Sequence, residues 1–296
     1  IELGQANDTI LGELDRLRPA RVVIDSLSEV RLLAQDPLRY RRQILTLRHF
    51  FDEREVTALL LDFMTKSDDR QLESLCHGII HLDQLAPSYG GQRRRLRVTK
   101  LRESSFRDGY HDFNITQGGM QVYPRLVAAE HARGIPHGVQ TCSSGLTELD
   151  ALTGGGLDRG TSTLILGPAG AGKSTLSAIY AKATVERGEK VVFFVFDEVP
   201  NTLILRGEEL GLNVRQHIQS GQMAVRQVDP AELAPGQFAH LVRAAVEEFG
   251  ASMIVIDSVN GYTSAMPEEH FLHAHLHELL SYLNQREIIS VLIMTQ

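Results

Sequence analysis

A strand that ends in aspartate and serine occurs twice in this chain, and the spacing of the two copies most constrains the fold. VVIDSLS, at residues 22–28, returns as IVIDSVN at residues 254–260, so Asp25 and Asp257 lie 232 positions apart. At the same offset, each copy continues with an amphipathic helical pattern and then an apolar run. Apolar strands that alternate with such helices are typical of a mostly parallel sheet covered on both faces. The sequence therefore predicts a tandem-duplicated α/β fold.

The two copies contain different parts of the repeated unit. The second copy has a glycine-rich phosphate loop with its lysine at Lys173, whereas the counterpart in the first copy would precede residue 1. The segment VTKLRESSF, at residues 98–106, would recur only after Gln296. We therefore expect 1–130 to be the C-terminal part of a first domain that lacks its phosphate loop. We expect 131–143 to be a linker, since it holds Gly, Pro and polar residues, and 144–296 to be the N-terminal part of a second domain.

The phosphate loop is the strongest motif in the chain. Residues 167–174, GPAGAGKS, follow an apolar strand pattern and open an amphipathic helix, which is the context that G-x-x-x-x-G-K-[ST] requires. The glycines let backbone N–H groups surround a phosphate, and the helix N-terminus adds positive partial charge. Lysine would reach the β- and γ-phosphates, and serine would bind Mg²⁺. We expect nucleotide contacts from Gly167, Ala169, Gly170, Ala171, Gly172, Lys173, Ser174 and Thr175.

Acidic residues end two further strands of the predicted sheet. Asp257 closes SMIVID and is expected to help Ser174 hold Mg²⁺, and Asp25 occupies the same place in the first copy. Asp197 and Glu198 follow the strand KVVFFVF, at the edge where α/β sheets bind ligands. One of these two acids would orient or deprotonate the attacking water or a protein hydroxyl.

The motifs together resemble the RecA-like core of KaiC-type ATPases. The resemblance rests on SSGLTELDALTGGGL (143–157), the phosphate loop, FDE and IVIDS, and it covers nearly the whole chain. It implies a homohexameric ring that binds ATP and Mg²⁺ between subunits, with regulatory protein partners and possible phosphorylation of its own Ser and Thr. It also implies that Lys100, Leu101 and Arg102 form a hairpin tip that contacts the ATP of a neighbouring subunit. The sequence departs from the family at Asp197, where Glu is usual, and after the hairpin tip, where Glu103 and Phe106 stand.

Composition narrows the function further. The net charge of −7 and the pI near 6.0 argue against a large nucleic-acid surface. The two cysteines form no CxxC pair, which favours a reducing cytoplasm, and no apolar run is long enough to cross a membrane. A RecA-type DNA-dependent ATPase remains the alternative, because it shares the phosphate-loop core. A regulator that binds ATP without hydrolysing it is a third hypothesis.

Overall fold

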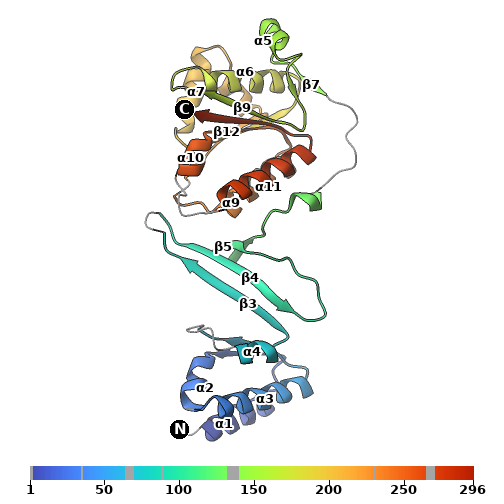
Figure 1. The fold of residues 1–296 in the computed structure, drawn as a ribbon, viewed down its shortest axis with the longest axis vertical. Helices are drawn as coiled ribbons and strands as arrows, with labels where there is room; N and C mark the ends of the chain where they lie inside the picture. Colours follow the sequence, from blue (N-terminus) through green and yellow to red (C-terminus); the bar gives the residue numbers. More distant parts are fainter. Residues whose placement is uncertain are drawn as a thin grey trace. The chain divides into compact units, whose positions relative to one another are not determined.

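The computed structural model divides the chain into two compact units, which are described separately (Figure 1). Unit 1 comprises 1–80 and 98–107, and unit 2 comprises 81–97 and 108–296. These units follow contacts rather than sequence similarity, so the predicted domains 1–130 and 144–296 remain a prediction. Most of the predicted linker lies outside the described residues. The described residues are 3–34, 36–63, 70–87, 90–131, 140–229, 231–264 and 271–296.

The centre of unit 2 is a five-stranded parallel sheet. Its strands are β9 (Ser162–Gly167), β10 (Lys190–Val195), β11 (Met223–Gln227), β12 (Ala251–Asp257) and β13 (Ile289–Thr295). Their order is β11-β10-β12-β13-β9, with every neighbouring pair parallel. Three of these strands, β10, β12 and β13, are apolar almost throughout because both of their faces are buried.

Helices cover both faces of this sheet, which confirms the predicted α/β architecture (Figure 1). Val191, Phe193 and Val255 pack in one core with α6 (Lys173–Glu186), α7 (Pro200–Glu209) and α8 (Val214–Gln219). Their strand neighbours Val192 and Ile254 pack in a second core with α9 (Pro235–Glu247) and α11 (Leu272–Gln285). The short α10 (Val259–Ser264) follows β12. Across the described residues, no helix is long and apolar enough to span a membrane.

Segments before the phosphate loop also belong to unit 2. The strands β5 (His111–Thr116) and β6 (Gly119–Tyr123) pair antiparallel with each other, and β5 pairs antiparallel with β4 (Arg93–Leu101), whose other neighbour is β3 (Gly78–Leu85). Residues 81–85 of β3 and 93–97 of β4 belong to unit 2, and the rest of these two strands belongs to unit 1. Strands β5 and β6 are followed by the 3-10 turn η1 (Ala128–His131), whose Ala128 N–H donates to Glu278 at 2.9 Å. The lead-in to the phosphate loop contains β7 (Thr141–Cys142), α5 (Thr147–Leu152) and β8 (Leu157–Asp158).

Unit 1 is smaller, and helices cover only one face of its two parallel strands among the described residues. Its parallel strands β1 (Arg21–Asp25) and β2 (Thr57–Leu61) carry α1 (Leu3–Leu17), α2 (Leu27–Ala34) and α3 (Pro37–Glu53) against one face, and α4 (Arg70–Leu75) follows β2. The other face of the two strands is open. Val23, Leu59 and Leu61 on that face are 59%, 57% and 45% exposed.

The elements of unit 1 correspond in order to those of unit 2. The run α1–β1–α2–α3–β2 matches α9–β12–α10–α11–β13 at the offset of 232 residues found in the sequence. The open positions of unit 1 match Val255, Val291 and Ile293, which are at most 1% exposed and pack in the core that contains α6. The open face of unit 1 is therefore the one that the phosphate-loop helix covers in unit 2.

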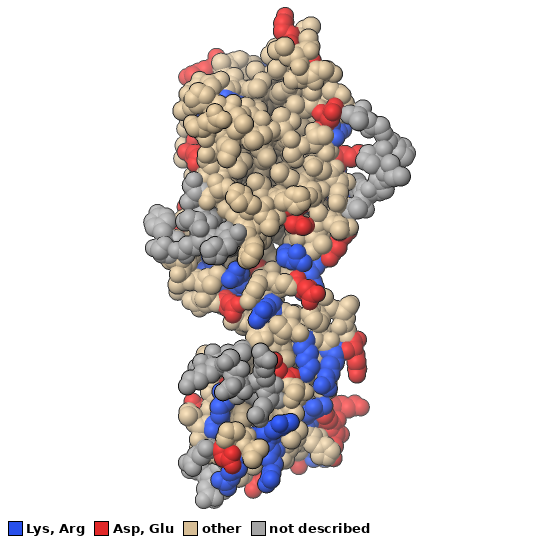
Figure 2. Space-filling model, viewed as in Figure 1, with Lys and Arg blue, Asp and Glu red and all other residues tan. Residues whose placement is uncertain are grey.

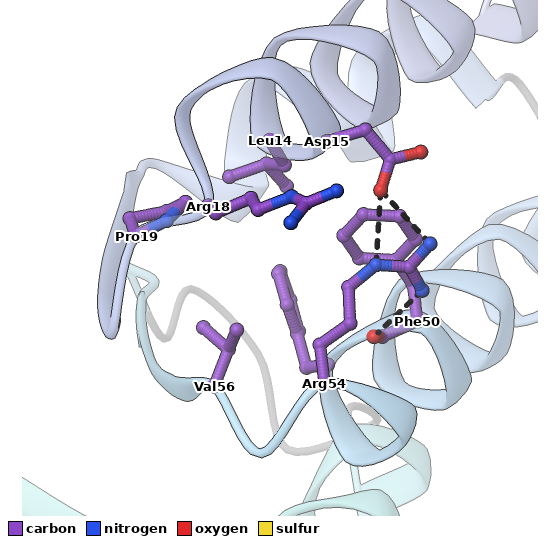
Figure 3. A pocket seen from close by; sticks show the side chains of 8 residues that line it. Leu14, Asp15, Arg18, Pro19, Phe50, Arg54 and Val56 are labelled. Atoms are coloured by element: carbon purple, nitrogen blue, oxygen red, sulfur yellow. Dashed lines mark hydrogen bonds and ion pairs between the residues drawn. The ribbon is translucent and has the colours of Figure 1, made fainter.

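Unit 1 contains a hollow of about 360 Å³, and residues beside it match residues of unit 2 at the same offset (Figure 3). Beside it, the Arg54 guanidinium lies 3.7 Å from the Phe50 ring centroid and pairs with Asp15 at 2.8 Å. In unit 2 the matching guanidinium, of Arg286, pairs with Glu247 at 3.4 Å, and the His131 ring packs edge-on against Tyr282. The hollow is lined by Leu14, Asp15, Arg18, Pro19, Phe50, Phe51, Arg54 and Val56.

Candidate functional site

The phosphate loop joins the end of β9 to the start of α6. Gly170 and Gly172 have φ values of 79° and 85°, left-handed conformations that favour glycine, and Gly172 is the N-cap of α6. A Cβ atom at either position would meet nothing within 4 Å, so the loop is open on that side. Ala169 and Ala171 are also exposed. The loop backbone is therefore accessible on this side.

Lys173 and Ser174 begin α6 beneath this loop. The Lys173 ammonium donates to the carbonyl oxygens of Gly167, at 2.9 Å, and Pro168, at 2.8 Å. The side chain thus lies back across the loop, where it is only 9% exposed. Ser174 Oγ donates to Asp257 Oδ2 at 2.6 Å, and Thr175 is half-buried in the next position. The helix start therefore brings a cation and a hydroxyl to the carboxyl edge of the sheet.

Asp257 ends β12 and is also only 9% exposed. Burial raises the pKa of its carboxyl group, the hydrogen bond from Ser174 and the charge of Arg206 oppose the rise, and the charges of Glu198 and Asp197 reinforce it. The negative charge of Asp257 is therefore poorly stabilised by the protein alone. A divalent cation near this carboxylate would compensate that cost.

Asp197 and Glu198 lie in the turn after β10 and have different partners. Ser258 Oγ donates to Asp197 Oδ2, so Asp197 is tied to the end of β12. Arg206, on α7, donates to both oxygens of Glu198, at 2.8 and 3.1 Å. Side-chain exposure is 22% for Glu198 and 37% for Arg206. A bidentate pair of this kind fixes the carboxylate plane.

Sequence reasoning missed Arg206 and Ser258 as members of the site. Ser258 directly follows Asp257 in the repeated motif, so the sequence could have identified it as a site residue. Arg206 stands eight residues after Glu198 on the next helix, and only the packing of α7 brings the two together. Both side chains hold an acid that the sequence singled out.

The remaining predicted site residues all lie in unit 1. Asp25 ends β1 and is exposed. Lys100 Nζ donates to the Glu73 carbonyl oxygen at 2.6 Å, and Arg102 donates to the Ser74 carbonyl oxygen at 3.3 Å. Leu101, between them, is 43% exposed. The structure thus gathers the phosphate loop, Asp257, Asp197 and Glu198 within unit 2, whereas the predicted hairpin tip and Asp25 belong to unit 1.

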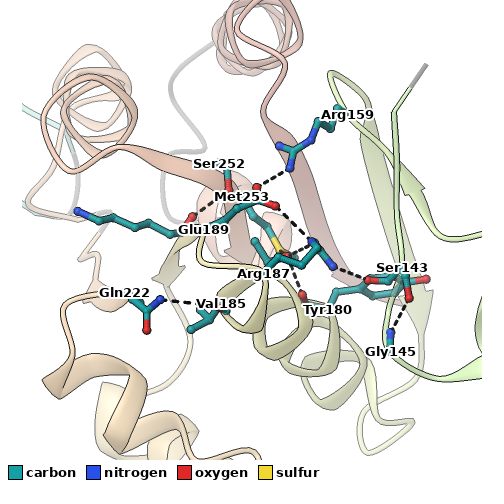
Figure 4. A network of polar contacts seen from close by, with 12 residues as sticks. Ser143, Gly145, Arg159, Tyr180, Val185, Arg187, Glu189, Gln222, Ser252 and Met253 are labelled. Atoms are coloured by element: carbon teal, nitrogen blue, oxygen red, sulfur yellow. Dashed lines mark hydrogen bonds and ion pairs between the residues drawn. The ribbon is translucent and has the colours of Figure 1, made fainter. Parts of the chain in front are cut away.

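A polar network secures the far end of α6 (Figure 4). Arg187 donates to the Ser143 carbonyl at 2.9 Å and to Glu189 Oε1 at 3.2 Å, and Arg159 donates to Glu189 Oε2 at 2.5 Å. Ser143 in turn hydrogen-bonds to Asp150, and this bond, with one from the Ser144 N–H, lowers the pKa of Asp150. The network ties the lead-in segment, α6 and β10 together, and it therefore positions the helix whose other end forms the phosphate loop.

The residues present suit a nucleotide with Mg²⁺. Ser174 and Asp257 offer adjacent hydroxyl and carboxylate oxygens, which are the hard ligands that Mg²⁺ prefers. Among the described residues no group of three or more Asp, Glu, His or Cys forms a metal cluster by itself. Mg²⁺ usually keeps several waters and phosphate oxygens in its shell besides its protein ligands.

Comparisons with known proteins agree with this geometry. The KaiC ATPase family model matches residues 2–127 and 142–296. Circadian clock protein KaiC2 of Synechocystis sp. is 25% identical over 255 residues, covering 83% of this chain and 44% of the relative. Circadian clock oscillator protein KaiC is 26% identical in Acaryochloris marina, covering 61% of this chain and 34% of the relative. The Synechococcus elongatus protein of that name is 24% identical, covering 67% of this chain and 38% of the relative. The chain thus spans less than half the length of these relatives.

Proposed function

Because the chain belongs to the KaiC ATPase family, we propose that unit 2 contains the ATP site of a magnesium-dependent P-loop ATPase. The observation that carries the proposal is the contact between Ser174 and Asp257, 2.6 Å apart at the end of a phosphate loop. It joins the two motifs that a P-loop enzyme needs at one sheet edge. ATP bound there would supply the phosphoryl group, and Mg²⁺ would neutralise its charge.

Different side chains would have different roles in such a reaction. Lys173 is placed to exchange its two loop carbonyl partners for phosphate oxygens, because its ammonium already lies over the loop. Ser174 and Asp257 would hold the cation. Glu198 would orient or deprotonate the attacking group, with its plane set by Arg206. Asp197 is one methylene shorter than the Glu usual in the family, so in this proposal the role falls to Glu198.

We further propose that the active assembly is a homohexameric ring in the cytoplasm. Lys100, Leu101 and Arg102 of one subunit would then contact the nucleotide of the next, since a cation supplied in trans stabilises phosphoryl transfer. In this arrangement 1–130 and 144–296 are parts of two similar domains, joined through 131–143. The open face of unit 1 supports this, because its counterpart in unit 2 is covered by α6.

The ring would serve as a signalling or clock-type regulator with protein partners, and it would phosphorylate its own Ser and Thr side chains in addition to hydrolysing ATP. Such a function couples the nucleotide state to the conformation of the ring. Phosphate incorporation into the protein, measured by mass spectrometry after incubation with Mg-ATP, distinguishes the kinase activity from hydrolysis alone.

The decisive experiment is nucleotide binding to this chain, followed with a fluorescent ATP analogue, beside phosphate release and light scattering. We expect Lys173→Ala to weaken binding at least tenfold, since it removes a charge-assisted contact to phosphate. Lys182→Ala, on the same helix and paired with Glu186 at 3.8 Å, is the matched control and should bind normally. Equal binding by both variants would refute the phosphate-loop assignment. Strong stimulation of hydrolysis by single-stranded DNA would favour the RecA-type alternative.

A further inference from the structure

Two arginines of β4 gather on one aromatic ring in unit 2. Arg95 and Arg97 are two residues apart on the strand, so their side chains leave the same face. Their guanidinium carbons lie 4.8 and 5.1 Å from the centroid of the Tyr110 ring. Their Nε atoms are buried without hydrogen-bond partners, and neither side chain has a carboxylate partner among the described residues. Figure 2 shows Lys and Arg side chains in the region of β3 and β4, with some Asp and Glu side chains among them.

This arrangement concentrates positive charge beside a small hollow. Both guanidiniums lie near one centroid, so they are at most about 10 Å apart, within roughly one Debye length at 0.1 M salt. The hollow has a volume of about 40 Å³. The carboxylate in its lining, Asp112, accepts a hydrogen bond from the Gly236 N–H at 2.7 Å. The lining residues are Arg95, Tyr110, Asp112, Tyr123, Arg125, Pro235, Gly236 and His275.

We propose that this hollow binds a small tetrahedral oxyanion of the phosphate type. Arg95 would donate to it from the wall of the hollow and Arg97 from two residues further along β4, and Arg125 in the lining adds positive charge. The volume corresponds to roughly three water-sized probes, which suits a single phosphate group rather than a nucleotide. The site shares no residue with the phosphate loop, so it is a second anion site.

Packing on Tyr110 does not by itself account for the pair. A cation–π contact contributes only about 0.5–1 kcal/mol at an exposed site. The second guanidinium brings a like charge close to the first, which an oxyanion would offset. A single-stranded nucleic acid fits less well, because it needs free aromatic faces for its bases. Tyr123 is only 5% exposed and packs against His240, and Tyr110 already carries guanidiniums.

Inorganic phosphate is the probe for the test, followed by NMR on the arginine Nε–H signals of the whole chain. Lys173→Ala serves as the background, so that phosphate bound at the phosphate loop does not contribute. We expect saturable shifts of the Arg95 and Arg97 signals. Arg95→Gln with Arg97→Gln removes these signals, so phosphate binding to this variant is measured by calorimetry, and it should be at least tenfold weaker. Arg94→Gln, on the opposite face of the same strand, is the matched control and should bind as the parent does.

Several outcomes would overturn the site. One is the absence of saturable shifts in the Lys173→Ala background, and another is an equal loss of binding in Arg94→Gln. Tighter binding of oligothymidylate than of phosphate would assign the arginines to nucleic acid instead. If the double variant fails to fold, Arg97→Gln alone tests the same donor, and Tyr110→Phe, which keeps the ring, should retain binding. None of these results bears on the function proposed for the phosphate loop.

Discussion

At the scale of single residues, Asp257 is subject to opposing demands of stability and function. Its carboxylate is buried beside two other acids, which raises its pKa, and yet the same carboxylate is the best-placed ligand for a cation. A group whose pKa is raised on folding stabilises the fold when protonated and loses that contribution as the pH rises through the folded value. At neutral pH, therefore, the charge on Asp257 reduces the free energy of unfolding. Under the proposed function, stability is given up here for a binding site.

We predict that Asp257→Asn makes the nucleotide-free protein more stable at pH 7. The amide still accepts a hydrogen bond from Ser174 but carries no charge, so the melting temperature should rise by about 1–4 °C. Magnesium-dependent nucleotide binding should fall about 10–100-fold. Calorimetry and a binding titration check the two effects. A lower melting temperature together with unchanged binding would show that Asp257 is a structural residue.

Arg206 offers a second test at this scale. Arg206→Gln should fold, because the partly exposed ion pair of Arg206 with Glu198 contributes less than about 1 kcal/mol to the free energy of unfolding. The substitution releases Glu198 from this pair. It also removes a positive charge that lowers the pKa of Asp257. The pKa of Asp257, followed by carboxyl NMR, should therefore rise, and the pH profile of hydrolysis should change. Arg206→Lys keeps the charge and should preserve the pKa of Asp257, although it loses the bidentate fork. If Gln and Lys variants have the same pH profile, Arg206 does not act through its charge.

At the scale of elements, α6 is held at both ends. Its N-terminus forms the phosphate loop, and its C-terminus enters the network around Glu189. Although burial tends to raise it, hydrogen bonds from Arg159, Ser252 and Arg187 hold the pKa of Glu189 below its usual range. The carboxylate thus stays ionised in the fold to a lower pH than in the unfolded chain. Its contribution to stability is present above about pH 4.5 and is lost as the pH falls through the folded value.

Glu189→Gln should consequently destabilise the protein at neutral pH and much less in acid. We expect a loss of about 1–3 kcal/mol in the free energy of unfolding at pH 7, typical of hydrogen bonds to a charged group. The difference from the parent should shrink towards pH 3. Urea unfolding at several pH values measures it. Glu186→Gln, whose partner Lys182 is 3.8 Å away at the surface, should change the free energy by less than about 0.5 kcal/mol. A difference that does not vary with pH would contradict the role of the Glu189 charge.

At the scale of the whole molecule, two similar runs of elements stand in different surroundings. Val23 and Val255 occupy matching strand positions, but Val23 is 59% exposed and Val255 is fully buried beneath the phosphate-loop helix. The same residue type therefore has a different energetic value in each unit. Its value depends on whether a helix covers that face of the sheet.

This contrast leads to a matched pair of substitutions. Val255→Thr should lower the free energy of unfolding by about 1–3 kcal/mol, because it buries a hydroxyl in an apolar core. Val23→Thr should have little effect on unfolding and should reduce self-association, because it makes an exposed apolar face more polar. Circular dichroism and light scattering check both. Equal destabilisation by the two changes would mean that the face of unit 1 is covered in solution.

Much of the fold and part of the site could be predicted from local sequence. The phosphate loop, the strand ends at Asp257 and Asp197, and the paired runs of elements depend on patterns within one or two elements. The pairing of Arg206 with Glu198 and the stacking of Arg95 and Arg97 on Tyr110 could not be predicted. These contacts depend on how helices and strands from separate segments pack.

The sequence by itself determined which segments are strands and helices and where the phosphate loop lies, because hydrophobic periodicity and glycine spacing act locally. Only the tertiary structure decided which chemical groups meet. It joined Ser258 to Asp197 across 61 residues and Arg206 to Glu198, and neither pair was predicted from the sequence. It also left one sheet face open in unit 1 and closed the matching face in unit 2. The physical reason is that burial and side-chain contact depend on the order and packing of distant elements, which no local pattern specifies.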